Sequence, residues 1–187
     1  MAVSGKNKGS RFERAVARMI DAWWEVSPKT FARSENSGGV SQPGDIAPRL
    51  MPRQAPPWFP FLLECKHYKD FNFFELFNAE TKTGPKIIKW WRQTVEAQGR
   101  AIVELNYPAQ EVMKLMIFKR NNSKIFCAFE PYELKYHEIL TLIGKRPPVT
   151  TISLYLPNFT EEVLVMDFEI FMSIYTKQMC IQLFSGK

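Results

Sequence analysis

The segment FLLECKHYKD, residues 61–70, places three consecutive apolar residues directly before charged ones. A short apolar run of this kind is typical of a β-strand. Because side chains alternate between the two faces of a strand, Glu64 and Lys66 would share one face and Cys65 would point to the other. The chain therefore ends an apolar strand in a carboxylate and an ammonium group. A surface ion pair on an edge strand would explain this pattern, and a functional site is the alternative.

The remaining patterns predict helices and strands in mixed order. We expect a helix from Ser10 to about Trp24, strands at 29–34, from Asp45 and at 61–66, a helix from Pro85 to about Gln98 ended by Gly99, a hairpin of strands 114–119 and 124–129, a helix at 132–144, strands near 151–156 and 162–166, and a helix near 168–178. Residues 49–60 are predicted as a loop or hairpin extension, and residues 67–84 contain a helical turn or hydrophobic lid. This order predicts a mixed α/β layer fold, with a central sheet flanked by helices.

The first predicted helix is amphipathic, with one residue out of place. At about 100° per residue its apolar side chains share one arc, and its arginines lie opposite: Phe12, Val16, Met19, Ile20, Trp23 and Trp24 against Arg11, Arg14 and Arg18. Glu13 falls inside the apolar arc. Ser10 could cap the helix with Glu13 completing a capping box, or Glu13 could belong to a site. The sequence leaves both explanations open.

Carboxylates stand near the ends of two predicted strands. Asp45 follows Gly44 where one strand begins, and Glu64 lies at the end of the next. If these strands pair, two carboxylates and the ammonium group of Lys66 meet. Close carboxylates repel one another, and a hard divalent cation relieves that repulsion. Mg²⁺ prefers oxygen ligands, to which the backbone carbonyl of Cys65 could be added. Lys66 could then orient or deprotonate a water, so the pattern indicates metal-dependent phosphodiester hydrolysis.

The composition limits the compartment and the class of partner. A net charge of +6 and a pI near 9.2 permit a polyanionic partner, although a solvated basic tail would explain the cations of residues 1–18 equally well. No apolar run is long enough to cross a bilayer, and the N-terminus lacks the apolar region of a secretory signal. Three widely spaced cysteines predict reduced thiols in a cytosol-like compartment and make a structural zinc site improbable.

Four segments in order resemble the PD-(D/E)XK nuclease superfamily, and within it the archaeal-type and phage Holliday junction resolvases. They are KGSRFERAVARMI (8–20), FARSENSGG (31–39), GDIA (44–47) and LLECKHYKD (62–70). The resemblance covers about residues 6–130. It implies a restriction-endonuclease-like core over residues 1–130, with residues 131–187 as a C-terminal α/β extension packed on that core. It also implies an endonuclease that uses Mg²⁺, with Mn²⁺ as a substitute, and acts as a homodimer on branched DNA.

The resemblance assigns roles to individual residues. Asp45 and Glu64 match the metal-binding acids, Lys66 matches the catalytic lysine, and Glu13 matches a helix glutamate that completes the acidic cluster, directly or through water. The site serine is Ser34 or Ser37, with Ser37 favoured. The family's helix glutamine is replaced by Lys86 near its usual place, because Gln93 lies deeper in the helix. The expected DNA-binding residues are Lys8, Arg11, Arg14, Arg33, Ser34, Ser37, Lys86 and Lys119.

Other interpretations remain open at this point. The hairpin residues Lys119, Arg120 and Lys124 would contact DNA or simply be solvated. Trp90 and Trp91 would form a stacking platform, a dimer face or part of the core. The same active site would serve a restriction or repair nuclease acting on linear duplex, and a non-catalytic DNA-binding module is the third reading. If the chain is viral, as its phage relatives suggest, the host cytoplasm is the expected location.

Overall fold

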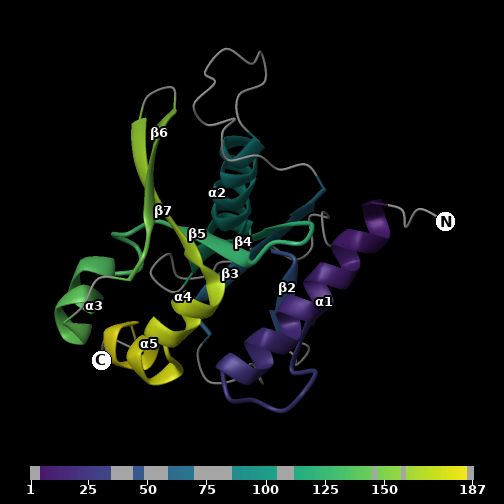
Figure 1. Ribbon diagram of the computed structural model, residues 1–187, viewed down its shortest axis with the longest axis horizontal. Coiled ribbons are helices and arrows are strands. Elements are labelled where there is room, and N and C mark those ends of the chain that lie inside the picture. The colour runs from purple at the N-terminus through teal and green to yellow at the C-terminus, as the bar shows by residue number, and fades with distance from the viewer. Residues whose placement is uncertain are drawn as a thin grey trace.

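The computed structural model describes residues 5–34, 44–48, 59–69, 86–104, 112–144, 147–156 and 159–184. The described residues form one seven-stranded sheet in the order β1-β2-β3-β4-β5-β7-β6, with helices on both faces (Figure 1). The strands are β1 (Phe31–Arg33), β2 (Ile46–Pro48), β3 (Phe61–Tyr68), β4 (Met113–Arg120), β5 (Ile125–Phe129), β6 (Thr150–Leu156) and β7 (Phe159–Asp167). The helices are α1 (Gly5–Trp23), α2 (Lys86–Glu104), α3 (Tyr136–Ile143), α4 (Phe168–Ile174) and α5 (Lys177–Phe184). β3 and β4 are parallel, and the other neighbouring strands are antiparallel.

The two faces of the sheet have separate apolar cores. Leu63 and Cys65 of β3 pack with α1 and with the C-terminal helices α3, α4 and α5. On the other face, α2 packs Trp90 and Trp91 against β4, β5 and β7. Both tryptophans are buried, which settles that they belong to the core. The apolar arc of α1 is also confirmed, with Arg11, Arg14 and Arg18 exposed on its opposite side.

The predicted start of α1 and the predicted end of α2 are wrong. α1 begins at Gly5, so Ser10 lies inside the helix and cannot form a capping box with Glu13. α2 continues through Gly99 to Glu104. Ala97 and Ala101, on either side of the glycine, pack against Leu62 and Val112. This packing outweighs the roughly 1 kcal/mol that glycine costs inside a helix.

The last predicted helix is divided into α4 and α5 at Tyr175. The Tyr175 carbonyl accepts a hydrogen bond of 2.8 Å from Trp23 Nε1 in α1, and its buried hydroxyl donates to Leu134 O at 3.1 Å. The next helix begins again after Thr176, whose Oγ1 accepts the N–H of Met179 at 3.2 Å in the manner of an N-cap. Tertiary contacts therefore break a segment whose local pattern favours one helix.

Of the remaining predictions, some are confirmed, one helix is shorter than predicted, and some fall on residues outside the described ranges. The hairpin of β4 and β5 is confirmed, with Asn122 in the left-handed region at φ 57°. The helix predicted at 132–144 is shorter, because residues 131–135 form turns before α3, and Gly144 ends it at φ 66°. Residues 49–58, the lid segment 70–84, Pro85 and Ser37 lie outside the described residues. None of the described helices is long and apolar enough to cross a membrane.

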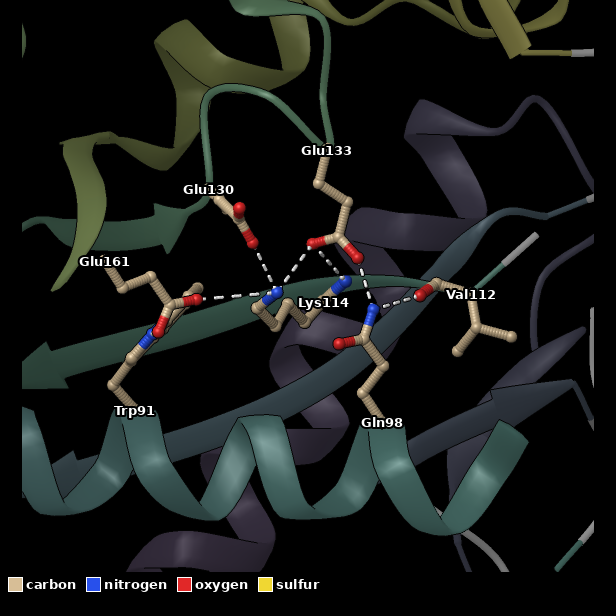
Figure 2. Close-up of polar contacts among 7 residues, drawn as sticks. All are labelled: Trp91, Gln98, Val112, Lys114, Glu130, Glu133 and Glu161. Atoms are coloured by element: carbon tan, nitrogen blue, oxygen red, sulfur yellow. Dashed lines mark hydrogen bonds and ion pairs between the residues drawn. The ribbon is translucent and has the colours of Figure 1, made fainter. Parts of the chain in front are cut away.

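A buried ion cluster joins α2 and β4 to the C-terminal segment (Figure 2). The Lys114 ammonium on β4 lies 2.6 Å from Glu130, 3.2 Å from Glu133 and 3.6 Å from Glu161 on β7. From α2, Trp91 donates to Glu161 at 2.8 Å, and Gln98 donates to Glu133. Burial alone would lower the pKa of Lys114, but the surrounding carboxylates outweigh it and raise that pKa. The ammonium group is therefore held charged inside the protein.

Candidate active site

The candidate site lies next to the short pairing between β2 and β3, just before Ile46. Gly44 sits at φ +84°, and a Cβ atom there would lie 3.0 Å from the Leu63 carbonyl oxygen, so this position requires glycine. The Asp45 N–H donates to Leu63 O at 2.8 Å, and the buried Ser34 hydroxyl donates to Gly44 O at 2.9 Å. Ser34 N–H also donates to Asp45 O at 2.9 Å. The end of β1 and the edge of β3 thus fix the backbone that carries Asp45.

Beyond Leu63, no strand of the described residues pairs with this edge of β3, and the Asp45 side chain faces it. Asp45 Oδ2 accepts the Cys65 N–H at 2.8 Å. Because the N–H and C=O of a strand residue leave the same edge, the Cys65 carbonyl also lies on the Asp45 side, away from β4. Glu64 and Lys66 share the face covered by α2 and form an ion pair of 2.7 Å. The predicted pairing of the Asp45 and Glu64 strands is confirmed.

Glu13 approaches the same edge from α1. Its carboxylate is buried in the apolar arc and accepts a hydrogen bond from Arg33 Nε on β1. Asp45 lies close enough for its charge to raise the pKa of Glu13. The structure therefore brings Glu13, Asp45, Glu64 and Lys66 around one strand edge, with Arg33 beside them.

Electrostatics in this cluster disfavour three ionised carboxyl groups. Burial is the main cause that raises the pKa of Glu13, Asp45 and Glu64, and the charge of Asp45 adds to it for the other two. The Cys65 N–H and the charges of Lys66 and Arg33 oppose the rise at Asp45 without cancelling it. A cation placed among these groups would offset the cost of burying their negative charges and the repulsion that Asp45 exerts on Glu13 and Glu64.

One basic residue near the site was missed by sequence reasoning. Arg100 is exposed on α2, and its positive charge contributes to lowering the pKa of Glu64, although burial dominates. The helix was predicted to end at about Gln98, so the sequence did not place Arg100 near the site. Extending the helix periodicity past Gly99 would have placed Arg100 two turns after the exposed Gln93, on the same side of the helix.

The residues predicted to bind DNA lie in several environments. Arg11 and Arg14 are exposed on α1, and Lys86 is exposed at the start of α2. Lys8 and Lys119 are partly buried, Arg33 pairs with Glu13, Ser34 bonds Gly44, and Ser37 lies outside the described residues. At the hairpin, Lys124 forms an ion pair of 3.0 Å with Asp167.

The donor atoms at this edge suit a hard divalent cation. The carboxylates of Asp45 and Glu64 and the Cys65 carbonyl are oxygen ligands of the kind Mg²⁺ prefers. Among the described residues, no three acidic, histidine or cysteine side chains lie close enough together to hold one ion by themselves. A cation there would be held by the carboxylates of Asp45 and Glu64, the Cys65 carbonyl and water. The Glu13 carboxylate instead accepts a hydrogen bond from Arg33.

A family model described as "Phage putative PDDEXK endonuclease" matches residues 4–182. The chain belongs to this PDDEXK endonuclease family. Membership indicates a nuclease with DNA as its substrate class, and it agrees with the restriction-endonuclease-like α/β core predicted from the sequence. It does not distinguish junction resolvases from other nucleases. Searches of curated proteins and of solved structures gave no match.

This PDDEXK endonuclease departs from the motif in one position. Gly44 stands before the aspartate where the family name places proline. Proline has φ near −65°, so it could not adopt the φ of +84° found here. The match runs through β7, α4 and most of α5, so both the site and the C-terminal strands lie inside the family's extent.

Without metal, the free energy of unfolding of the wild-type protein is expected to fall as pH rises. Replacing Asp45 by Asn is expected to make this fall smaller. The folded state holds the pKa of Asp45 above its ordinary value, mainly through burial. Between the ordinary and the raised pKa, the folded protein binds more protons than the unfolded one, so stability falls as pH rises through that window. Asn keeps an acceptor for the Cys65 N–H and does not ionise. Urea unfolding in EDTA, from about pH 4 to about pH 8, measures the difference. Equal slopes for wild type and Asp45→Asn would contradict the raised pKa.

Proposed function

We propose that this PDDEXK protein is a Mg²⁺-dependent endonuclease that hydrolyses phosphodiesters in branched DNA, with four-way junctions as the preferred substrate. The observation that carries the proposal is the meeting of Asp45, Glu64 and Lys66 at the edge of β3 that faces Asp45, where burial raises the pKa of both acids. Mn²⁺ is expected to substitute for Mg²⁺. The host cytoplasm is the proposed place of action, as for a phage nuclease.

The residues divide the chemistry among them. Asp45, Glu64 and the Cys65 carbonyl would hold the metal, which when bound supplies Lewis-acid polarisation of the scissile phosphate. Lys66 Nζ donates to Glu64 at 2.7 Å and therefore lies beside these ligands. From this position it would orient or deprotonate the attacking water and stabilise negative charge that develops on the phosphate oxygens.

Glu13 and Arg33 would set the position of the site relative to DNA. Arg33 holds the Glu13 carboxylate and lowers its pKa against the dominant effect of burial. The exposed Arg11 and Arg14 of α1 lie beyond this pair and supply positive charge for DNA phosphates. Ser34, whose hydroxyl bonds Gly44 O, would act by fixing the Asp45 backbone.

The branched substrate rests on the resemblance to junction resolvases. A four-way junction requires two symmetry-related cuts, and a homodimer with a two-fold axis would supply two sites. An enzyme for linear duplex would share the same acids and lysine. A non-catalytic module would not need all four residues, and their common location argues against it.

A cleavage assay with a matched pair of substrates tests the function. A labelled four-way junction and a linear duplex of the same sequence would be incubated with the full chain, with Mg²⁺ or with EDTA. Paired symmetric nicks in the junction alone, dependent on Mg²⁺, are expected. Equal or faster cutting of the duplex would contradict junction selectivity but leave the site intact. If neither DNA is cut and calorimetry detects no Mg²⁺ or Mn²⁺ binding, the protein is a non-catalytic module.

A further inference from the structure

Tyr68 continues the row of side chains that begins with Glu64 and Lys66. Alternate residues of a strand share one face, so Glu64, Lys66 and Tyr68 follow one another on the α2 side of β3. Successive members of the row are about 7 Å apart. Tyr68 is the last residue of the strand, and its side chain is 44% exposed. An aromatic ring is therefore presented to solvent directly beyond the proposed catalytic lysine.

The Tyr68 ring is held by a column of aromatic side chains. It lies 4.6 Å from the Trp90 ring of α2 at an interplanar angle of 31°. Trp90 is buried and lies 6.5 Å from Phe118 on β4, which stacks on Phe126 of β5 at 5.9 Å. Phe118 is the register partner of Lys66 on the neighbouring strand. The column therefore fixes Tyr68 relative to Lys66 and gives the ring little freedom to lose on binding.

Exposed cations lie on the elements that carry this ring and the aromatic residues behind it. Lys69 follows it in the chain, and Arg120 is its register partner at the end of β4; both are exposed. Lys86 and Lys89 are exposed in the first turn of α2, and Lys86 lies one turn before Trp90 on the same side of that helix. An aromatic ring set among cations matches a nucleic acid strand, whose bases stack while its phosphates meet basic side chains.

We propose that Tyr68 stacks on an unpaired nucleobase close to the scissile phosphate, a role that rests on the proposed cleavage at Glu64 and Lys66. The distance along β3 from Glu64 to Tyr68, about 13 Å, corresponds to roughly four nucleotides at a stacked rise of about 3.4 Å. A base in an intact duplex has both faces covered by its neighbours. A base at a branch point is unstacked at lower cost, so Tyr68 makes the enzyme prefer DNA that is opened near the cut.

Binding and cleavage by Tyr68 variants test this role separately. The substrates are a fully paired linear duplex and a four-way junction that carries 2-aminopurine at single unpaired positions near the branch. In EDTA, wild type and Tyr68→Phe are expected to quench the fluorescence of 2-aminopurine at one position, and Tyr68→Leu is not. Tyr132→Leu, which alters a tyrosine that is 80% exposed before α3, serves as the control and is expected to behave as wild type.

With Mg²⁺, Tyr68→Leu is expected to lower kcat/KM on the four-way junction by about tenfold to a hundredfold, the range for loss of one stacked base. The affinity for the fully paired duplex, measured in EDTA, should change little. An equal loss of affinity for the duplex and the junction, or unchanged quenching by Tyr68→Leu, would overturn the role of Tyr68. A change in oligomeric mass without a change in quenching would instead make Tyr68 part of an interface between two copies. Quenching without cleavage by wild type would retain stacking and remove the proposed nuclease function.

Discussion

Replacing Lys66 by Met is expected to lower the single-turnover rate of DNA cleavage by about 10²- to 10⁴-fold, the range for loss of a positioned proton-transfer or charge-stabilising group. Lys66 lies within 2.7 Å of Glu64, beside the carboxylates proposed to bind metal. Met retains the apolar stem of lysine and removes only the ammonium group. Single-turnover conditions separate this effect on the chemical step from effects on DNA binding or product release.

Lys69→Met is the matched control for Lys66→Met. Lys69 is an exposed lysine that follows β3 directly, so both variants remove one positive charge from nearly the same place. We expect Lys69→Met to alter DNA affinity modestly and to leave the single-turnover rate near that of wild type. Equal rates for Lys66→Met and wild type, with both proteins folded, would exclude Lys66 from the chemical step. A similar loss of rate in both variants would show that the effect comes from removing positive charge near the site and not from a specific role of Lys66.

Replacing Lys114 by Met is expected to lower the free energy of unfolding by about 3–5 kcal/mol, the range for removing one partner of a buried ion pair. Glu133 and Glu161 would remain buried without their counterion, and Glu130 would lose its bond of 2.6 Å. Urea or thermal unfolding in EDTA measures the loss. The loss should be smaller in acid, because protonation of the orphaned carboxyl groups removes their charge.

Two further variants make the result for Lys114 specific. Lys89→Met alters an exposed lysine on α2 and is expected to change stability by less than about 0.5 kcal/mol. The triple variant Lys114→Met with Glu133→Gln and Glu161→Gln removes the unpaired charges and should recover part of the lost stability. If Lys114→Met unfolds at the same urea concentration as wild type, the cluster does not contribute to stability in the way its geometry indicates.

Strongly periodic segments were predictable from the sequence alone. The apolar run before Glu64 predicted β3, and the arc of α1 gave its buried face correctly. The errors occurred where contacts with residues far away in the sequence determine where a helix ends. Gly99 would end an isolated helix, but packing of Ala97 and Ala101 carries α2 past it. Tyr175 divides the last helix because its carbonyl bonds Trp23, more than 150 positions earlier in the chain.

The sequence predicted which residues gather at the candidate site, but it did not predict how their side chains pair with basic residues. The spacing of Asp45, Glu64 and Lys66 was enough to expect one cluster, because strand alternation fixes the direction of each side chain. Nothing local indicates that Arg33 holds Glu13, or that Arg100 comes near Glu64 from another element. Such pairs depend on how the helices pack on the sheet. For the same reason Tyr68 did not stand out until Trp90 was placed behind it.

The ion cluster around Lys114 determines where this gene can be divided. A protein that ended after residue 130 would keep the ammonium group and lose Glu133 and Glu161, two of the three carboxylates that neutralise it. It would also strip β5 of its neighbour β7. The later strands therefore could not be exchanged between relatives as a separate cassette without simultaneous changes at Lys114, Trp91 and Gln98. Recombination within this gene is constrained to keep β4, α2 and β7 from one parent.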